Sequence, residues 1–230
     1  MDIHLKPSPA SGLDAGAQGF SAQELQTLAG FGKKLIFTGP GIKIFDQGEA
    51  ARKLYLLTEG VVRISRLLPD GSRHVLEFKW PGGFFGLKEE GVFANHAHTL
   101  TPCLIYEFES ETFTDFLLAH PSIQQKVLQR AIYNISSTYR QVIIVGRFGT
   151  QRALAAFLLD CASRDGFFDE QTSCLALPMS RYDIADYLGT AAESVTRAIT
   201  KLETGGLLKR CGPRELILNL AGLKCLANIE

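Results

Sequence analysis

The chain has 230 residues, of which 46% are hydrophobic and 21% are charged. This length fits one large domain or, as we favour, two of ordinary size, and the composition excludes a chain that is disordered throughout. Lys and Arg number 24 and Asp and Glu number 24, so no net charge draws the whole chain toward nucleic acid or an anionic membrane. A small basic face on a neutral protein is nevertheless sufficient for nucleic-acid binding.

The cysteines and the N-terminus indicate in which cellular compartment the protein works. The five cysteines are widely spaced and form no Cys-x-x-Cys pair, which argues against a disulfide framework and a zinc knuckle. The N-terminus lacks the apolar core of a signal peptide, and no later run is long enough to span a bilayer. We therefore expect a cytoplasmic protein without membrane contact.

The first part of the chain predicts an arm and then a β-rich domain. Residues 1–20 are rich in Pro, Ser, Gly and Ala, which is typical of a flexible arm. Over residues 21–120 we expect a sensor-type β-roll, introduced by a short helix with a Ser21/Glu24 capping box. Short β-forming runs follow, and Pro69-Asp70-Gly71 between two of them predicts a hairpin. Many short strands at near-regular spacing predict a roll or sandwich.

Residues 121–147 predict one long connecting helix. Its apolar residues follow a three/four spacing, which forms a seam along one face. The seam includes Ile123, Val127, Ala131, Ile135 and Val142. Such a seam either covers the β-roll of its own chain or packs against the same helix of a second copy, and the pattern alone supports the two equally.

Residues 148–230 predict a compact helical domain with a hairpin. "TQRALAAFLLDCASRDG" reads as an amphipathic helix that ends at Gly166. Two short amphipathic segments follow on either side of Gly189, and Gly205-Gly206 ends the second. The turn at Gly212-Pro213 joins two short strands. The organisation is thus a β-roll, a connecting helix and a helical domain.

The two short segments around Gly189 predict a helix-turn-helix. Ser180 can cap the first helix, with Asp183 as its reciprocal partner. Closely crossing helices need a small residue at the contact, a residue that tolerates positive φ in the turn, and an apolar residue that fixes the second helix. Ala185, Gly189 and Val195 occupy these positions.

The exposed face of the second predicted helix carries Glu193, Thr196, Arg197 and Lys201. One interpretation of Glu193 and Arg197 is a surface salt bridge worth about 0.2–0.5 kcal/mol. The other is base reading in the major groove, where a carboxylate accepts from cytosine and a guanidinium donates twice to guanine. The helix-turn-helix favours base reading. Against a single acidic residue, Glu203, the neighbourhood has five basic residues: Arg197, Lys201, Lys209, Arg210 and Arg214.

The chain as a whole resembles the cyclic-AMP receptor protein/FNR superfamily of bacterial transcription regulators. The resemblance covers roughly residues 21–220, and "RYDIADYLGTAAESVTRAITKLETGGLLKR" carries most of it. The pattern Glu193-Ser-Val-Thr-Arg197 is similar to the FNR and FixK branch. The resemblance implies an α+β fold with an N-terminal double-stranded β-helix (jelly roll), a dimerisation helix and a C-terminal winged helix-turn-helix. It also implies a homodimer that binds double-stranded DNA at a palindromic TTGA-type operator, with RNA polymerase as a partner of an activator.

The resemblance also assigns roles to residues of the helix-turn-helix. Glu193, Thr196 and Arg197 would read bases. The implied contacts to the DNA backbone are Ser180, Arg181, Thr190, Ser194 and Lys201. One departure is Ala191, because relatives commonly have Ser or Thr there. We expect the second helix to be capped by Thr190 or to be poorly capped.

The sequence argues against two effectors of this family. Members that bind cyclic nucleotides hold the phosphate with an arginine, but no arginine occurs here between Arg73 and Arg130. Oxygen-sensing members hold an iron–sulfur cluster with clustered N-terminal cysteines, but no cysteine precedes Cys103. We therefore expect no cofactor. A haem- or small-ligand-dependent gas or redox sensor of the same family is the alternative.

His96 and His98 are weak candidates for a metal or haem site. Residues two apart on a strand point to the same face, so both imidazoles could serve one ligand. This spacing raises an alternative of another class, a cupin-like metalloenzyme with an accessory DNA-binding domain. Those enzymes place a carboxylate a few residues on, where this chain has "TLTPC". We favour plain surface histidines, no metal and no enzyme.

Cys211 is a candidate redox switch. It lies among Lys209, Arg210 and Arg214, and cationic neighbours lower a thiol pKa and favour the reactive thiolate. Oxidation would place a negative charge beside DNA phosphate and weaken binding. A hairpin also tolerates an inert cysteine, and the sequence leaves both interpretations open.

Overall fold

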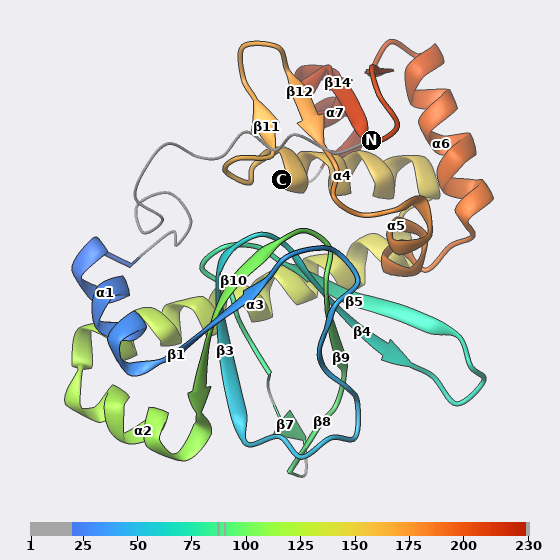
Figure 1. Cartoon of the computed structure of the whole chain (residues 1–230). Helices are drawn as coiled ribbons and strands as arrows, with labels where there is room; N and C mark the ends of the chain where they lie inside the picture. The colour runs from blue at the N-terminus through green and yellow to red at the C-terminus, as the bar shows by residue number, and fades with distance from the viewer. Residues whose placement is uncertain (1–19, 87, 90, 229–230) are drawn as a thin grey trace.

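A computed structural model describes residues 20–86, 88–89 and 91–228 (Figure 1). The flexible arm predicted over residues 1–20 lies outside the described residues, apart from Phe20. That residue is buried and packs edge-on against Phe84, with the ring centroids 6.1 Å apart.

The N-terminal domain is a β-roll made of two four-stranded sheets. Their strands are β1 (Lys33–Phe37), β2 (Lys43–Phe45), β3 (Lys53–Glu59), β4 (Val62–Leu67), β5 (Arg73–Lys79), β6 (Phe84–Phe85), β9 (His96–Thr99) and β10 (Cys103–Glu109). The orders are β1-β10-β3-β6 and β2-β9-β4-β5, while β7 (Lys88–Glu89) and β8 (Val92–Phe93) form a two-stranded ribbon. The expected double-stranded β-helix is confirmed.

Glycines form two of the corners of the roll. The predicted hairpin at Pro69-Asp70-Gly71 joins β4 to β5, and Gly71 has a φ of 83°. Gly60 lies where the chain passes from β3 in one sheet to β4 in the other, with a φ of 89°. A Cβ atom there would lie 2.2 Å from the Pro102 carbonyl oxygen, so only glycine fits this crossing.

Three helices pack beside the roll. Helix α1 (Ala22–Phe31) has the expected capping box, in which Glu24 N–H donates to Ser21 Oγ and Ser21 N–H donates to Glu24. Helix α2 (Ser110–Ala119) and the start of α3 (Pro121–Arg147) follow β10. Together with the roll these helices bury Leu28, Phe108, Phe113, Phe116 and Ile123.

Helix α3 has two different environments along its 27 residues. Ile123 is 2% exposed, and Val127 packs against the same buried cluster of its own chain. Ala131 is exposed, and Ile135 and Val142 are 53% and 65% exposed. The two interpretations of the seam therefore divide along the helix: its start covers the roll, and an apolar stripe on one face of its remainder is exposed, while Ile144 near its end is buried in the core of the C-terminal domain. The exposed stripe is the part of the seam that remains available for the predicted dimer contact.

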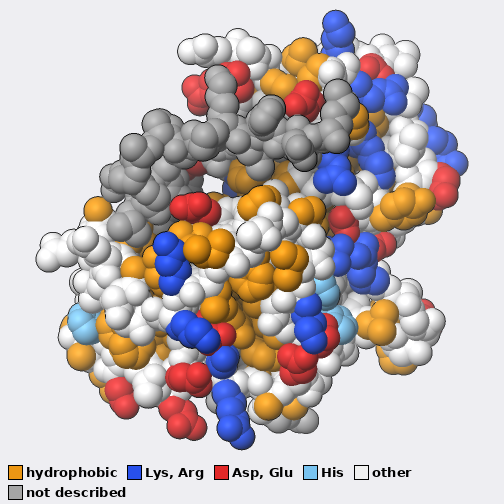
Figure 2. All heavy atoms as spheres, in the orientation of Figure 1, with side chains coloured by type: hydrophobic (Ala, Val, Ile, Leu, Met, Phe, Trp, Pro, Cys, Tyr) orange, Lys and Arg blue, Asp and Glu red, His pale blue; other side chains and the backbone are white. Residues whose placement is uncertain are grey.

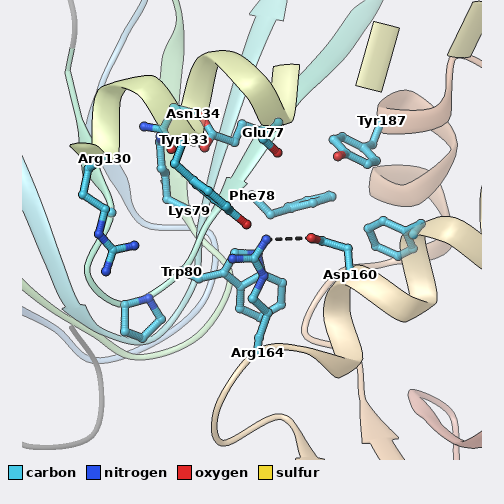
Figure 3. Close-up of a pocket in the computed structure, with 14 residues that line it drawn as sticks. Glu77, Phe78, Lys79, Trp80, Arg130, Tyr133, Asn134, Asp160, Arg164 and Tyr187 are labelled. Atoms are coloured by element: carbon cyan, nitrogen blue, oxygen red, sulfur yellow. Dashed lines mark hydrogen bonds and ion pairs between the residues drawn. The ribbon is translucent and has the colours of Figure 1, made fainter. Parts of the chain in front are cut away.

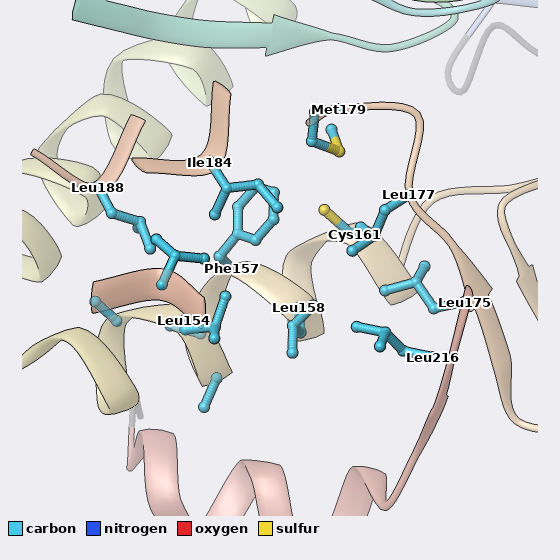
Figure 4. Packing of buried hydrophobic residues seen from close by; sticks show 14 of the residues in the cluster. Leu154, Phe157, Leu158, Cys161, Leu175, Leu177, Met179, Ile184, Leu188 and Leu216 are labelled. Carbon is cyan, nitrogen blue, oxygen red and sulfur yellow. The ribbon is translucent and has the colours of Figure 1, made fainter. Parts of the chain in front are cut away.

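The C-terminal domain places four helices around a small sheet. The helices are α4 (Thr150–Ala162), α5 (Arg181–Leu188), α6 (Ala192–Thr204) and α7 (Leu220–Ala227). The sheet, of order β11-β12-β14-β13, comprises β11 (Phe168–Asp169), β12 (Cys174–Ala176), β13 (Leu208–Arg210) and β14 (Glu215–Leu218). The hairpin β13–β14 was predicted, whereas β11 and β12 were not. Leu154 and Leu158 of α4 are fully buried at the centre of this domain (Figure 4).

The core of the C-terminal domain continues into the β-roll. Phe78 at the end of β5 lies 5.2 Å from Tyr187 and 6.0 Å from Phe157, measured between ring centroids. Val61, Val75 and Trp80 of the roll belong to the same buried cluster. Among the described residues, none of the helices is both long and apolar enough to cross a membrane.

Candidate nucleic-acid interface

The first helix of the predicted helix-turn-helix is α5, and its N-terminus is fully capped. Asp183 N–H donates to Ser180 Oγ over 3.1 Å. In return, Ser180 N–H and Ser180 Oγ donate to Asp183 Oδ2 over 3.0 and 2.7 Å. The predicted capping box is confirmed, and it fixes the residue at which α5 begins.

The turn between the helices has the predicted backbone conformation and packing. Gly189 ends α5 in the left-handed conformation, with φ 62° and ψ 37°. Ala185 is 2% exposed and Val195 is fully buried, as the crossing of α5 and α6 requires. A Cβ atom on Gly189 would lie 3.3 Å from Val145 Cγ1, so the turn also lies against the end of α3.

The second helix, α6, begins without a side-chain cap. Its N-cap residue is Ala191, and the structure, over the residues it describes, shows no side-chain cap hydrogen bond there. Thr190 precedes the N-cap, and its own N–H donates to the Ala185 carbonyl within the turn. Of the two expectations for this helix start, poor capping is therefore the correct one.

The outer face of α6 carries the predicted base-reading residues. Glu193, Thr196, Arg197 and Lys201 are exposed, while Val195, Ala198, Ile199 and Leu202 are buried. Within the described chain, Glu193 and Arg197 form no ion pair; Arg197 Nη2 instead donates to Ser194 Oγ over 2.9 Å. Thr196 Oγ1 donates to the Ala192 carbonyl over 3.0 Å. Both charged side chains are thus exposed and are not paired with each other.

The residues expected at the DNA backbone have different surroundings. Ser180 uses its hydroxyl in the α5 cap, so a phosphate would compete with Asp183 for it. Arg181 is half-buried, and burial together with the charge of Arg210 lowers its pKa. Thr190 and Ser194 are half-buried, and Lys201 is exposed.

The hairpin β13–β14, the predicted wing, is hydrogen-bonded to α6, the predicted recognition helix. Arg210 Nε and Nη2 both donate to Glu203 Oε2, and Arg210 N–H donates to Glu203 Oε1. Arg214 Nη1 donates to the Pro178 carbonyl, and Lys209 is exposed. Lys and Arg side chains gather over the part of the molecule that carries α6 (Figure 2).

Two arginines of the β-roll bind the start of α5. Arg63 Nη1 lies 2.6 Å and Arg73 Nη2 lies 3.0 Å from Asp183 Oδ1. Arg73 Nη2 also lies 2.6 Å from Asp186 Oδ2. Burial would raise the pKa of Asp183, but hydrogen bonds from Ser180 and Arg63 outweigh burial and lower it. The sequence did not predict this cluster, because its members are more than a hundred positions apart.

Cys211 has a second cysteine beside it. Its exposed Sγ atom lies 3.7 Å from the Sγ atom of half-buried Cys174. Burial and the contact with Cys211 raise the pKa of Cys174 to about 11. Two of the expected cationic neighbours are engaged elsewhere, Arg210 by Glu203 and Arg214 by Pro178. The pair was not predicted, because Cys174 lies on an unpredicted strand.

His96 and His98 lie on β9 with the expected common direction. Their ring centroids are 6.2 Å apart, and His96 Nδ1 lies 2.9 Å from Asp46 Oδ1. Burial lowers the pKa of His98. Within the described part of the chain, no group of three or more His, Cys, Asp or Glu side chains could hold a metal ion.

The N-terminal part and the C-terminal part of the chain each match the model of a known protein family. Residues 152–226 match the model of the Crp-like helix-turn-helix domain. Residues 38–120 match the model of the cyclic nucleotide-binding domain. The two matches fall on the α4–α7 domain and on the β-roll with α2.

Individual relatives match over most of the chain. The nitrogen fixation regulation protein FixK of Rhizobium meliloti is 35% identical over 205 residues, which are 86% of this chain and 89% of that protein. FixK of Bradyrhizobium diazoefficiens is 32% identical over 187 residues, 81% of this chain and 78% of that protein. The solved structure of FixK2 from Bradyrhizobium japonicum superposes with a TM-score of 0.76 and 26% identity, covering 86% of this chain and 98% of that one.

Proposed function

The chain belongs to the CRP/FNR family of DNA-binding transcription regulators, and from its FixK-type helix-turn-helix we propose that it binds a palindromic TTGA-type operator as a homodimer. The observation that carries this proposal is the outer face of α6, where Glu193 and Arg197 are exposed and are not paired with each other. We infer that the protein acts on DNA in the cytoplasm and is not an enzyme, since the relatives are regulators. RNA polymerase is a further partner if the protein activates transcription.

Base reading follows from the position of α6. The Glu193 carboxylate is an acceptor for cytosine N4, and the Arg197 guanidinium is a bidentate donor for guanine O6 and N7. Thr196 lies on the same exposed face and is suited to a base-edge contact. Lys201, one turn beyond Arg197, and Lys209 of the wing are suited to phosphates, which contribute affinity without selecting a sequence.

The uncovered stripe on α3 supports the homodimer. Its apolar residues are spaced alternately by four and three positions, the spacing of a coiled-coil seam. They are Leu128, Ile132, Ile135, Tyr139 and Val142. Two copies joined along this seam would present two α6 helices related by a two-fold axis, which matches the symmetry of a palindrome.

The residues of the roll do not fit a cyclic nucleotide. Aromatic rings fill the interior of the roll, with centroid separations of 3.9 Å between Phe45 and Phe93 and 5.2 Å between Tyr55 and Phe85. Tyr55 also lies within 2.9 Å of where a Cβ on Gly86 would be. With no arginine between Arg73 and Arg130 to bind the phosphate, we propose DNA binding without cyclic AMP. We likewise propose no iron–sulfur cluster and no other cofactor.

Two variants test the base-reading proposal. Arg197→Ala should weaken binding to the operator by about 1–3 kcal/mol and relax selection at one guanine. Lys201→Ala, the matched control one turn away, should weaken binding to all sequences to a similar degree. Affinities for operator and scrambled duplexes, measured at one salt concentration, give both results. Equal losses on the two duplexes for Arg197→Ala would mean that Arg197 is not a base reader.

We also propose that Cys211 is a redox switch with Cys174 as its partner, because their Sγ atoms are 3.7 Å apart. A hydroperoxide would oxidise the Cys211 thiol to a sulfenic acid by transferring one oxygen atom, and would itself be reduced to water or an alcohol. The Cys174 thiol would then lose its proton as its sulfur attacks the Cys211 sulfur, forming the disulfide and releasing the hydroxyl of the sulfenic acid with that proton as water. The bond would join the wing turn to β12 and change the wing that faces DNA.

Peroxide treatment tests the redox proposal. We expect the wild type to lose two thiols, to gain a peptide linked through Cys174 and Cys211 in mass spectrometry, and to bind operator less tightly until a thiol reductant is added. Cys211→Ser should be insensitive. If the treated wild type keeps both thiols and its full affinity, the proposal is wrong. If Cys174→Ser loses affinity as fully as the wild type, Cys211 acts alone.

A further inference from the structure

A polar cleft lies where the β-roll, α3 and α4 meet (Figure 3). Its volume is about 60 Å³, enough for several waters or one small ion. Trp80 and the end of β5 contribute one wall, and Arg130 and Tyr133 of α3 another. A second hollow of about 550 Å³ shares Tyr133, Asp160 and Tyr187 with it and runs on between α3 and α4.

Two guanidinium groups line this cleft with unused donors. Nη2 of Arg130 and Nε of Arg164, just after α4, are buried and have no hydrogen-bond partner within the described chain. Arg164 also donates from Nη2 to Asp160 Oδ1 over 2.7 Å, and its guanidinium lies 5.9 Å from the centre of the Trp80 ring. Buried donors are rarely left without an acceptor, so two in one cleft require an explanation.

The charges of the cleft do not balance. Lys79 is paired with Glu77 over 2.6 Å, and Arg164 is paired with Asp160. Arg130 takes part in no ion pair within the described residues, although it is half-buried. Burial lowers the pKa of Arg130, and the nearby charge of Arg164 lowers it further. An unpaired cation held out of water is destabilising unless an anion compensates it.

We propose that this cleft binds a small oxyanion, a phosphate or carboxylate group, between Arg130 and Arg164. Guanidinium groups are the preferred partners of both anions because their N–H groups diverge in one plane. Tyr133 points from α3 toward the Arg164–Asp160 pair in Figure 3, and its hydroxyl is a further donor. The rest of a larger anionic molecule would occupy the second hollow.

The occupant would join three parts of the molecule. Trp80 belongs to the roll, Arg130 to the long helix and Arg164 to the C-terminal domain. An anion bound between Arg130 and Arg164, with Trp80 lining the same cleft, stabilises the present arrangement and disfavours any arrangement that separates α3 from the C-terminal domain. The site is independent of the DNA-binding proposal, because neither arginine lies on the face of α6.

Anion binding at this site can be measured through the fluorescence of the single tryptophan. Trp80 is the only tryptophan of the chain, and it lines the cleft. We expect inorganic phosphate, titrated into full-length protein at constant ionic strength in chloride, to change Trp80 emission in a saturable way. A parallel titration with acetate distinguishes a phosphate site from a carboxylate site. If neither anion changes the emission up to tens of millimolar, the proposal is wrong.

Two variants locate the response. Arg130→Gln should abolish the emission change, while Lys201→Gln, which removes an exposed cation of α6, should keep it. Thermal unfolding gives a second readout: the saturating anion should raise the Tm of the wild type and of Lys201→Gln but not that of Arg130→Gln. Arg130→Gln should itself melt no lower than the wild type without the anion, since it removes an unpaired charge. The same emission change in Arg130→Gln would overturn the assignment.

Discussion

The Asp183 carboxylate belongs to two structures at once. Its Oδ2 atom accepts the cap hydrogen bonds of α5, and its Oδ1 atom accepts from Arg63 and Arg73 of the roll. A single side chain therefore sets both where the helix-turn-helix begins and how it faces the roll.

Removing the charge of Asp183 should be costly and pH-dependent. Asp183→Asn removes a buried charge and leaves Arg63, which is largely buried, without its carboxylate, while Arg73 keeps Asp186, so we expect a loss of about 3–5 kcal/mol in the free energy of unfolding. The pKa of Asp183 is lowered from 3.8 in the folded chain, so its stabilisation is present above that value and is lost as the pH falls through the folded pKa. Urea unfolding at pH 7 and at acidic pH measures both effects. If the difference in the free energy of unfolding between wild type and variant were the same at acidic pH as at pH 7, this account would be contradicted.

The missing cap of α6 can be restored. Ala191 has the extended backbone of an N-cap residue, φ −80° and ψ 149°, but no acceptor. Ala191→Ser should therefore raise the free energy of unfolding by about 0.5–2 kcal/mol. Ala191→Val, which adds side-chain volume without an acceptor, should give no gain. Chemical denaturation of the three proteins tests this, and equal effects of Ser and Val would rule out capping.

At the scale of elements, the packing role of α3 and its proposed role in dimerisation can be separated by substitutions. Ile135→Lys places a charge in the uncovered stripe, where Ile135 is 53% exposed, and should shift the proposed homodimer toward monomer. Ile123→Ala removes a side chain that is 2% exposed, and should instead cost about 2–5 kcal/mol of stability. Sedimentation equilibrium and denaturation distinguish the two results. A dimer that withstands Ile135→Lys would place the contact elsewhere.

The elements also show what the sequence could predict. The caps of α1 and α5, the hairpin at Gly71 and the turn at Gly189 were predicted correctly, because each depends on residues a few positions apart. The three/four spacing of α3 showed a seam but not which part the roll would cover, since that depends on where α2 packs. The contact of Asp183 with Arg63 and Arg73 joins positions more than a hundred apart, and no local pattern encodes it. The Cys174–Cys211 pair was missed because Cys174 lies on β12, a strand that the sequence did not predict.

At the scale of the whole molecule, the two domains share one hydrophobic cluster. Phe78 of the roll packs on Phe157 and Tyr187, so we expect both domains to unfold in a single cooperative transition. Phe78→Ala should cost about 3–5 kcal/mol and separate the calorimetric profile into two transitions. Phe85→Ala, a matched change inside the roll, should lower stability without separating them. A single transition in Phe78→Ala would show that other contacts couple the domains.

The tie between Glu203 and Arg210 bears on the speed of DNA association. The helix α6 and the wing hairpin β13–β14 are already joined by hydrogen bonds in the free protein. Both the backbone and the side chain of Arg210 donate to Glu203. Little conformational entropy then remains to be lost when the two meet the duplex together. We therefore expect the encounter rate to depend on diffusion and on electrostatic steering, and to fall with added salt, with no slow folding step before the complex forms.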